Sequence, residues 1–219
     1  MLNPNLDKKI SPDYYQRFRI WPSLFNIKPN SHVLDIGCGT GLLGNFIKEN
    51  YNCWVEGIEI LEEYQKISSR ILDKSYCADI ESFNTLKIKN KFEYIIFSDS
   101  LEHLLNPDEV LIKIQSLLSE NGKLLLSVPN VRNFRVTFPL IFKGQWEYQE
   151  EGLLDKTHLR FFTISSLINL LNKSGYQVNQ IHLDLPVKSK SGLLNLLTFG
   201  IFKNHLTSHY FVEACLIKY

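Results

Sequence analysis

The sequence has few cysteines and almost no excess charge, and both shortages exclude classes of protein. Its four cysteines (Cys38, Cys53, Cys77 and Cys215) form no C-x-x-C pair, so we predict neither a zinc site nor a disulfide framework. Lysine and arginine number 24 against 23 aspartates and glutamates, a balance that predicts no nucleic-acid partner. Reduced thiols are typical of cytosolic proteins, and we expect a cytoplasmic location.

Long hydrophobic runs are also missing. The first residues, MLNPNLDKKISPDYY, contain no apolar stretch typical of a signal peptide. The apolar run GLLNLLTFGIF near the C-terminal end is too short to span a bilayer. We expect a buried or capping helix there, with a helix lying on a membrane surface as the alternative. The length of 219 residues fits one domain.

Strand-like and helix-like runs alternate along the first 130 residues, which predicts an α/β fold with a parallel sheet covered on both faces. The expected strands are 32–36, 53–60, 75–80, 92–98 and 123–129, and the expected helices are 42–51, 61–74 and 107–122. An aromatic and charged insertion, 130–163, then breaks the rhythm. It resumes with a helix at 165–175, a strand at 176–185, a short helix at 191–202 and a closing strand at 210–219.

The turn after the first expected strand is rich in glycine. In VLDIGCGTG, Gly37, Gly39 and Gly41 free the backbone and leave room for a ligand. A dinucleotide fingerprint needs G-x-G-x-x-G, but here position 42 is leucine. Asp35 would repel a pyrophosphate, whereas it suits a ligand with an ammonium group.

A second carboxylate follows at the expected offset. Glu59 ends the second expected strand, 20 residues after Gly39, where it could accept hydrogen bonds from both hydroxyls of a ribose. A solvated strand end is the simpler reading of Glu59 alone. S-adenosylmethionine (SAM) carries an ammonium and a ribose diol but no phosphate, so the combination with the glycine turn predicts SAM as the cofactor.

Five segments occur in the order and spacing of class I SAM-dependent methyltransferases: VLDIGCGTG, VEGIEI, YCADIES, FEYIIFSDSLEHL and SENGKLLLSVPN. The chain resembles this family over residues 30–185. Within it, the chain looks similar to the subgroup of ubiquinone-biosynthesis O-methyltransferases and polysaccharide-cluster methyltransferases, and the stretch GQWEYQEEGLLDKTHLRFFT looks like the latter. The resemblance implies a doubly wound, seven-stranded, mostly parallel sheet with an antiparallel last strand and an insertion after strand five.

The resemblance also implies the cofactor contacts. Asp79 and Ile80 would lie at the adenine, Ile60 on its face, and Ser98 beside the methionine part. Residues 1–30 would form a helical cap from which Tyr14 or Arg17 could reach the cofactor carboxylate. The full expected cofactor set is Asp35, Gly37, Cys38, Gly39, Gly41, Glu59, Ile60, Asp79, Ile80 and Ser98.

Methyl transfer to a hydroxyl requires removal of a proton, which His or a carboxylate can accept. His103 follows the fourth expected strand, and His158 lies in the insertion. We favour His158 as the base, because acceptor contacts are expected from variable segments. His103 and Glu102 are the other catalytic candidates, and a helix-start histidine bonded to backbone is the simpler reading of His103.

A metal is the alternative to a protein base. Asp99, Glu102, His103 and His158 resemble the ligand set of metal-dependent small-RNA 2′-O-methyltransferases, and a divalent ion could lower the pKa of the acceptor. The first position of that set is glutamate in the family and aspartate here. We therefore assign no metal ligand.

The acceptor is the least determined part. The chain has SDSL where amine-directed methylases carry [DNS]-P-P-[YF], which favours an oxygen acceptor. In the insertion, Trp146 and Tyr148 could stack on a sugar ring, although anchoring the insertion to the core is the simpler role. Hydroxyl contacts could come from Glu147, Glu150 and Glu151, and contacts to a phosphorylated or acidic acceptor from Arg132, Arg135, Lys143, Lys156 and Arg160.

We therefore expect a SAM-dependent methyltransferase that modifies a hydroxyl of a sugar, glycan or other small molecule. Methylation of a quinone-like phenol or a small amine is the alternative. A SAM-binding partner protein without catalysis is a third reading. The sequence predicts no membrane span and leaves the oligomeric state open.

Overall fold

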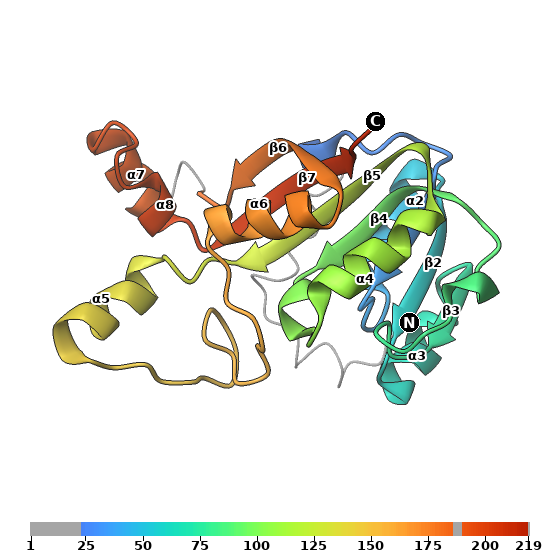
Figure 1. Ribbon diagram of the computed structural model, residues 1–219, viewed down its shortest axis with the longest axis horizontal. Helices are drawn as coiled ribbons and strands as arrows, with labels where there is room; N and C mark the ends of the chain where they lie inside the picture. The colour runs from blue at the N-terminus through green and yellow to red at the C-terminus, as the bar shows by residue number, and fades with distance from the viewer. Residues whose placement is uncertain (1–22, 186–189, 219) are drawn as a thin grey trace.

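The computed structural model describes residues 23–185 and 190–218 and is built on one seven-stranded sheet (Figure 1). The strand order is β3-β2-β1-β4-β5-β7-β6. β7 runs antiparallel to both of its neighbours, and the other paired strands are parallel. The predicted fold class is confirmed. The strands are β1 (His32–Ile36), β2 (Trp54–Glu59), β3 (Lys74–Cys77), β4 (Phe92–Ser98), β5 (Leu118–Pro129), β6 (Tyr176–Leu183) and β7 (His209–Leu216).

Helices lie on both faces of the sheet, with α4 and α6 side by side on the face toward the viewer in Figure 1. The α-helices are α2 (Leu42–Tyr51), α3 (Glu62–Ser68), α4 (Pro107–Ile114), α5 (Phe134–Lys143), α6 (Ile164–Lys173), α7 (Lys190–Leu197) and α8 (Lys203–Leu206). Short 3-10 helices are η2 (Thr85–Lys87), η3 (Leu101–His103) and η4 (Gln115–Leu117). The expected N-terminal cap, with Tyr14 and Arg17, lies mostly outside the described residues.

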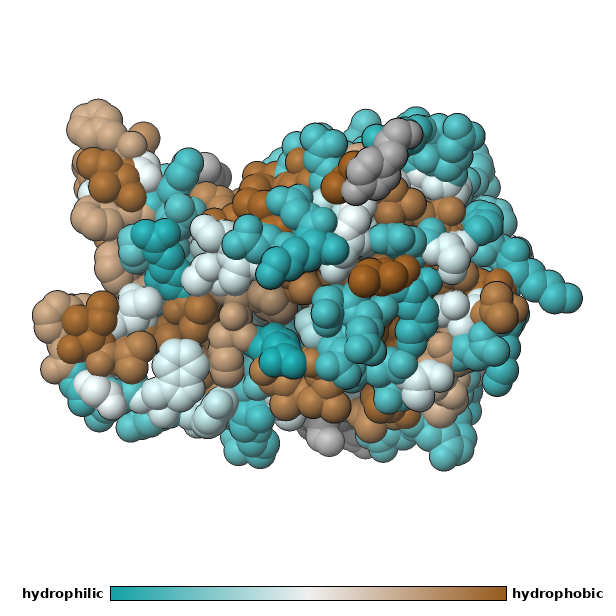
Figure 2. Space-filling view, viewed as in Figure 1, coloured by the Kyte–Doolittle hydropathy of each residue, from teal (hydrophilic) through white to brown (hydrophobic). Residues whose placement is uncertain are grey.

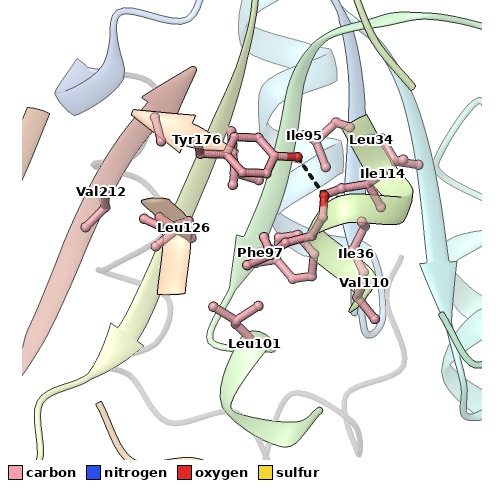
Figure 3. Packing of buried hydrophobic residues seen from close by; sticks show 14 of the residues in the cluster. Leu34, Ile36, Ile95, Phe97, Leu101, Val110, Ile114, Leu126, Tyr176 and Val212 are labelled. Carbon is pink, nitrogen blue, oxygen red and sulfur yellow. Dashed lines mark hydrogen bonds between the residues drawn. The ribbon is translucent and has the colours of Figure 1, made fainter. Parts of the chain in front are cut away.

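The alternation of side chains along the strands divides the core in two. Leu34 and Ile36 of β1 join the cluster that includes α4 and α6. Val33 joins the other cluster, with Leu43 and Ile47 of α2. In Figure 3 the first cluster packs around Tyr176, whose hydroxyl donates a hydrogen bond to the backbone oxygen of Leu111 at 2.9 Å. Both faces of the central strands are therefore covered by apolar side chains.

Two helix predictions were too long. The expected helix 107–122 ends at Ile114, and after η4 the chain enters β5 at Leu118. Leu118 pairs with Phe92 at the start of β4, so tertiary pairing extends the strand upstream. Gly122, the last residue of that expected helix, lies inside β5, where a Cβ would come within 2.8 Å of the Phe92 oxygen. The expected helix 61–74 likewise ends at Ser68.

The expected helix at 191–202 is not buried. The helix α7 ends at Leu197, turns follow up to residue 202, and most of the leucines of this segment face solvent. The prediction of a buried or capping helix is therefore wrong for this segment. The insertion contains a further helix, α5, which the sequence pattern did not indicate. No helix in the described ranges is long and apolar enough to cross a bilayer.

Candidate active site

The predicted glycine turn lies at the carboxyl ends of β1 and β2. Gly37, Gly39 and Gly41 all have positive φ, at 74°, 55° and 84°, a region that favours glycine. A Cβ on Gly37 would come within 2.7 Å of the Ser100 Cβ, whereas a Cβ on Gly39 would meet nothing within 4 Å. The turn therefore packs tightly on one side and is open at Gly39, where a ligand can approach the backbone.

Asp35 is a buried carboxylate at the base of this turn. It is 2% exposed, and its Oδ1 has no hydrogen-bond partner in the described chain. Burial, followed by repulsion from Glu59, raises the pKa of Asp35 to about 7. A cationic ligand next to Asp35 would favour its ionised form, so this carboxylate fits a ligand that carries an ammonium or sulfonium group.

Glu59 is held by two backbone hydrogen bonds, one of which comes from the glycine turn. Its Oε2 accepts from Gly39 N and its Oε1 from Leu61 N, both at 2.8 Å. A carboxylate oxygen can accept more than one hydrogen bond, so both oxygens keep capacity for the two hydroxyls of a ribose. The glycine turn and Glu59, the carboxylate expected to bind the ribose hydroxyls, are thus directly connected.

The other expected cofactor residues lie in different surroundings. Ile60 directly follows β2 and is 62% exposed, so its side chain offers an apolar surface on which a flat ring could pack. Asp79 accepts a hydrogen bond from Glu81 N at 2.8 Å. The side chain of Ile80 is buried in the core, and Ser98 is buried at the end of β4.

Cys38, another of the expected cofactor residues, packs against Gly57 of β2. A Cβ on Gly57 would come within 2.6 Å of its Sγ, so the thiol fills the space that this glycine leaves. Burial raises the pKa of Cys38 far above its usual value. The thiol therefore stays protonated at neutral pH.

A pocket of about 170 Å³ lies at the carboxyl ends of β4 and β5. It gathers carboxylates and imidazoles from segments far apart in the sequence. Its lining residues are Asp99, Glu102, His103, Pro129, Gly152, Asp155, His158 and His209.

Backbone contacts hold the insertion against η3 and so form this pocket. The backbone oxygen of Glu102 accepts hydrogen bonds from Leu159 N and Arg160 N, both at 2.9 Å. The Nδ1 of His103 lies 3.1 Å from the Thr157 oxygen. All three predicted catalytic residues, Glu102, His103 and His158, are thereby brought together, although 54 residues separate His103 from Thr157.

His158 has the properties of a proton acceptor. It is 8% exposed, and its Nε2 lies 3.9 Å from Glu102 Oε1. Burial, together with the neighbouring His103, lowers the pKa of His158 below its usual 6.5. The imidazole is therefore neutral at pH 7 and able to take up a proton.

The same residues are the part of the described chain that could hold a metal. Ligand atoms of Glu102, His103 and His158 lie within 4.8 Å of one another. Asp99, the fourth residue of the expected set, is not in this group. It has a positive φ of 49° and accepts a hydrogen bond from the Ser127 hydroxyl at 2.7 Å.

Sequence reasoning missed His209 and Asp155 as lining residues. His209 begins β7, and its Cα partner in β5 is Pro129. Because β7 is antiparallel, its first residue lies at the edge where the parallel strands end. The antiparallel last strand that the family resemblance implied was the signal that could have identified His209.

The aromatic and basic residues of the insertion do not line the pocket. Trp146 and Tyr148 pack against Phe161, with ring centroids 5.1 and 6.2 Å apart. Lys156 pairs with Glu150 at 2.6 Å, and the Arg160 guanidinium donates to the Leu105 oxygen. Their expected role in binding the acceptor has no support in this geometry.

Comparison with known proteins places the chain in a family. The family described as Methyltransferase domain matches residues 12–181. The chain belongs to this family. The resemblance to class I SAM-dependent methyltransferases, which the glycine turn and Glu59 indicated, is thus confirmed, and SAM is the cofactor of the methyltransferase family.

Individual relatives differ in what they methylate. The chain is 27% identical over 160 residues to a ubiquinone biosynthesis O-methyltransferase of Coxiella burnetii, covering 66% of each protein. It is 28% identical over 129 residues to (S)-tetrahydroprotoberberine N-methyltransferase of Eschscholzia californica, covering 55% of this chain and 36% of the relative. The chain therefore spans less than two thirds of the length of these curated relatives.

A solved structure shares the fold. The plantazolicin methyltransferase BpumL, in complex with a desmethyl plantazolicin analogue and S-adenosylhomocysteine, superposes with a TM-score of 0.65 at 18% identity. The match covers 98% of this chain and 89% of BpumL. At this identity the likeness concerns the fold.

Proposed function

We propose that this methyltransferase transfers the methyl group of SAM to a hydroxyl of a small molecule, with a sugar or glycan intermediate as the first candidate acceptor. The observation that carries the proposal is the buried, neutral His158 beside Glu102, in a pocket at the same sheet edge as the glycine turn. Both sites lie where parallel strands end, which is where open α/β sheets bind ligands.

The cofactor would lie across the glycine turn. SAM supplies an activated methyl group on a sulfonium. Asp35 favours the positive charge of the ligand, Glu59 accepts hydrogen bonds from the ribose, and Ile60 offers an apolar surface to the adenine. These residues orient the cofactor, and orientation is the main catalytic contribution when the methyl donor is already activated.

The hydroxyl proton would pass to a ring nitrogen of His158. The Glu102 carboxylate, 3.9 Å from Nε2, favours the imidazolium that forms. His103 positions the insertion through its contact with Thr157 and lies with its ring centroid 4.9 Å from that of His158. Because both His158 and Glu102 are buried, the proton transfer is shielded from bulk water.

The lining of the pocket supports a polyhydroxylated acceptor. Three carboxylates and three imidazoles offer hydrogen-bond partners to several hydroxyls at once. A phenol is the second candidate, favoured by the similarity to a ubiquinone biosynthesis O-methyltransferase. An amine acceptor is the third, since another relative is an N-methyltransferase.

The test is release of S-adenosylhomocysteine from SAM with three acceptor panels: nucleotide sugars, catechols and secondary amines. We expect turnover with a nucleotide sugar, undiminished by a chelator. Turnover with catechols alone would move the assignment to a phenol. Tight SAM binding without turnover on any panel would favour the non-catalytic reading, and loss of activity with chelator would assign Glu102, His103 and His158 to a metal.

A further inference from the structure

Two apolar projections extend from the sheet beside the pocket that contains His158, which we call the acceptor pocket. In Figure 1, α5 and the α7–α8 segment leave the left end of the sheet, and Figure 2 shows hydrophobic side chains gathered on both. Most of the large side chains on them face solvent. Those exposed by half or more include Phe138, Ile141, Phe142, Leu196, Leu197 and Phe199, the last at 94%.

The two projections are joined at their base. Asn130 and Asn133 each donate a side-chain hydrogen bond to the oxygen of Thr207, directly after α8, at 3.0 and 2.7 Å. Phe134 stacks on His205 with centroids 5.1 Å apart, and Arg132 Nε lies 3.2 Å from His205 Nε2. The exposed apolar groups therefore belong to one supported surface.

The two projections themselves carry charge of one sign. The segments 130–146 and 192–208 contain no aspartate or glutamate and carry Arg132, Arg135, Lys143 and Lys203, while Glu147 and Asp184 lie at their bases. This local excess is hidden in the net charge of +1. Apolar side chains beside cations are the pattern that inserts into the interface of an anionic bilayer. A second copy of the chain would bring cations against cations, which disfavours a dimer through this surface.

We propose that α5 and the α7–α8 segment form a membrane-binding surface for anionic lipid. Phe142 and Phe199 enter the acyl boundary while Arg135 and Lys143 contact lipid phosphates. The surface is continuous with the acceptor pocket, because Pro129 and His209 line that pocket and lead directly into the two projections. The inference does not depend on the identity of the acceptor.

The test is co-sedimentation of the full chain with vesicles of phosphatidylcholine alone or mixed with phosphatidylglycerol. We expect binding to the mixed vesicles that weakens with salt. The double substitution R135E/K143E should reduce affinity roughly 25-fold or more, at about fivefold per basic residue. F142S/F199S should reduce it roughly tenfold or more.

Matched controls are K87E/K89E, which changes the net charge equally, and L86S, which removes a leucine that is 85% exposed on η2. Both should bind vesicles like the wild type. Equal binding to the two kinds of vesicle, no binding to either, or wild-type binding by F142S/F199S would overturn the proposal. A dimer in sedimentation velocity that F142S/F199S dissociates, without vesicle binding, would assign the surface to self-association instead.

Discussion

The proposed cofactor site and the proposed acceptor pocket are neighbouring sites built in different ways. The cofactor site comes from residues 35–60, two consecutive strands and the turns after them, and backbone hydrogen bonds to Glu59 hold it together. The pocket collects residues from positions 99 to 209 and depends on contacts between η3 and the insertion. The first is a local device, whereas the second exists only in the folded chain.

The two sites also differ in the kind of titratable group that each one buries. Burial leaves Asp35 as an acid that gains from a cationic ligand. Burial keeps His158 as a neutral base that gains from a proton. If this contrast is right, substitutions in one site should change cofactor affinity and substitutions in the other should change turnover.

The largest effect is expected at His158. Replacing it with alanine removes the proton acceptor, which should lower kcat by roughly 10²- to 10⁴-fold while SAM affinity stays the same. Steady-state kinetics and a SAM titration measure the two quantities. His32→Gln, at the opposite end of β1, is the control. In the wild type, the acidic fall in kcat/KM should lie at a lower pH than an ordinary histidine would give, because His158 must be neutral and burial lowers its pKa. Unchanged turnover in His158→Ala would remove this residue from the mechanism.

Glu59→Ala should mainly change cofactor binding. Loss of a carboxylate that accepts hydrogen bonds from the ribose costs about 1.5–3 kcal/mol, which corresponds to roughly a 10- to 100-fold weaker SAM affinity in calorimetry. Glu62→Ala, which removes an exposed carboxylate paired with Lys66, is the control and should bind SAM like the wild type. Equal SAM affinity in the two variants would contradict the ribose assignment.

Asp35→Asn should remove the pH dependence of SAM binding. In the wild type, affinity should increase as pH rises through about 7, because the ionised carboxylate attracts the cationic ligand. The variant should bind about tenfold more weakly at pH 8, where the wild-type carboxylate is ionised. A pH-dependent affinity that persists in Asp35→Asn would place the titrating group elsewhere.

The same residue predicts a stability effect of known sign. Between its ordinary pKa of 3.8 and about 7, the folded state holds a proton on Asp35 that the unfolded state releases. The free energy of unfolding without ligand should therefore decrease as pH rises through this window. Asp35→Asn should unfold at a higher temperature than the wild type at pH 8 and at a similar one at pH 4. Thermal unfolding at the two pH values measures this, and a lower unfolding temperature at pH 8 would contradict it.

The smallest effect is expected in the core, away from both sites. Tyr176→Phe leaves the Leu111 oxygen without its hydrogen bond, which should cost about 1 kcal/mol of unfolding free energy. SAM affinity and kcat should stay the same, because Tyr176 lies in the core cluster under α4. Denaturant unfolding measures the change. A loss of turnover would show that the core around Tyr176 is coupled to the pocket that contains His158.

Much of the fold could be predicted because hydrophobic periodicity is a local signal. The bounds of β1, α2 and β4 match the expected ranges. The errors at 107–122 and 191–202 occur where tertiary contacts decide: pairing with Phe92 extends β5, and α7 remains exposed although its sequence is apolar. Amphipathic or apolar composition shows what a segment could bury, and it does not show whether a partner is available.

The amino-acid sequence by itself determined the alternation of strands and helices, the glycine turn and the carboxylate that follows it, because these depend on local periodicity, on backbone freedom and on spacing within about 25 residues. Only the tertiary structure decided that His158 lies against Glu102, that His209 reaches the same pocket and that two basic, apolar projections stand beside it. Those arrangements depend on strand order and on contacts between distant segments, which residue spacing does not encode.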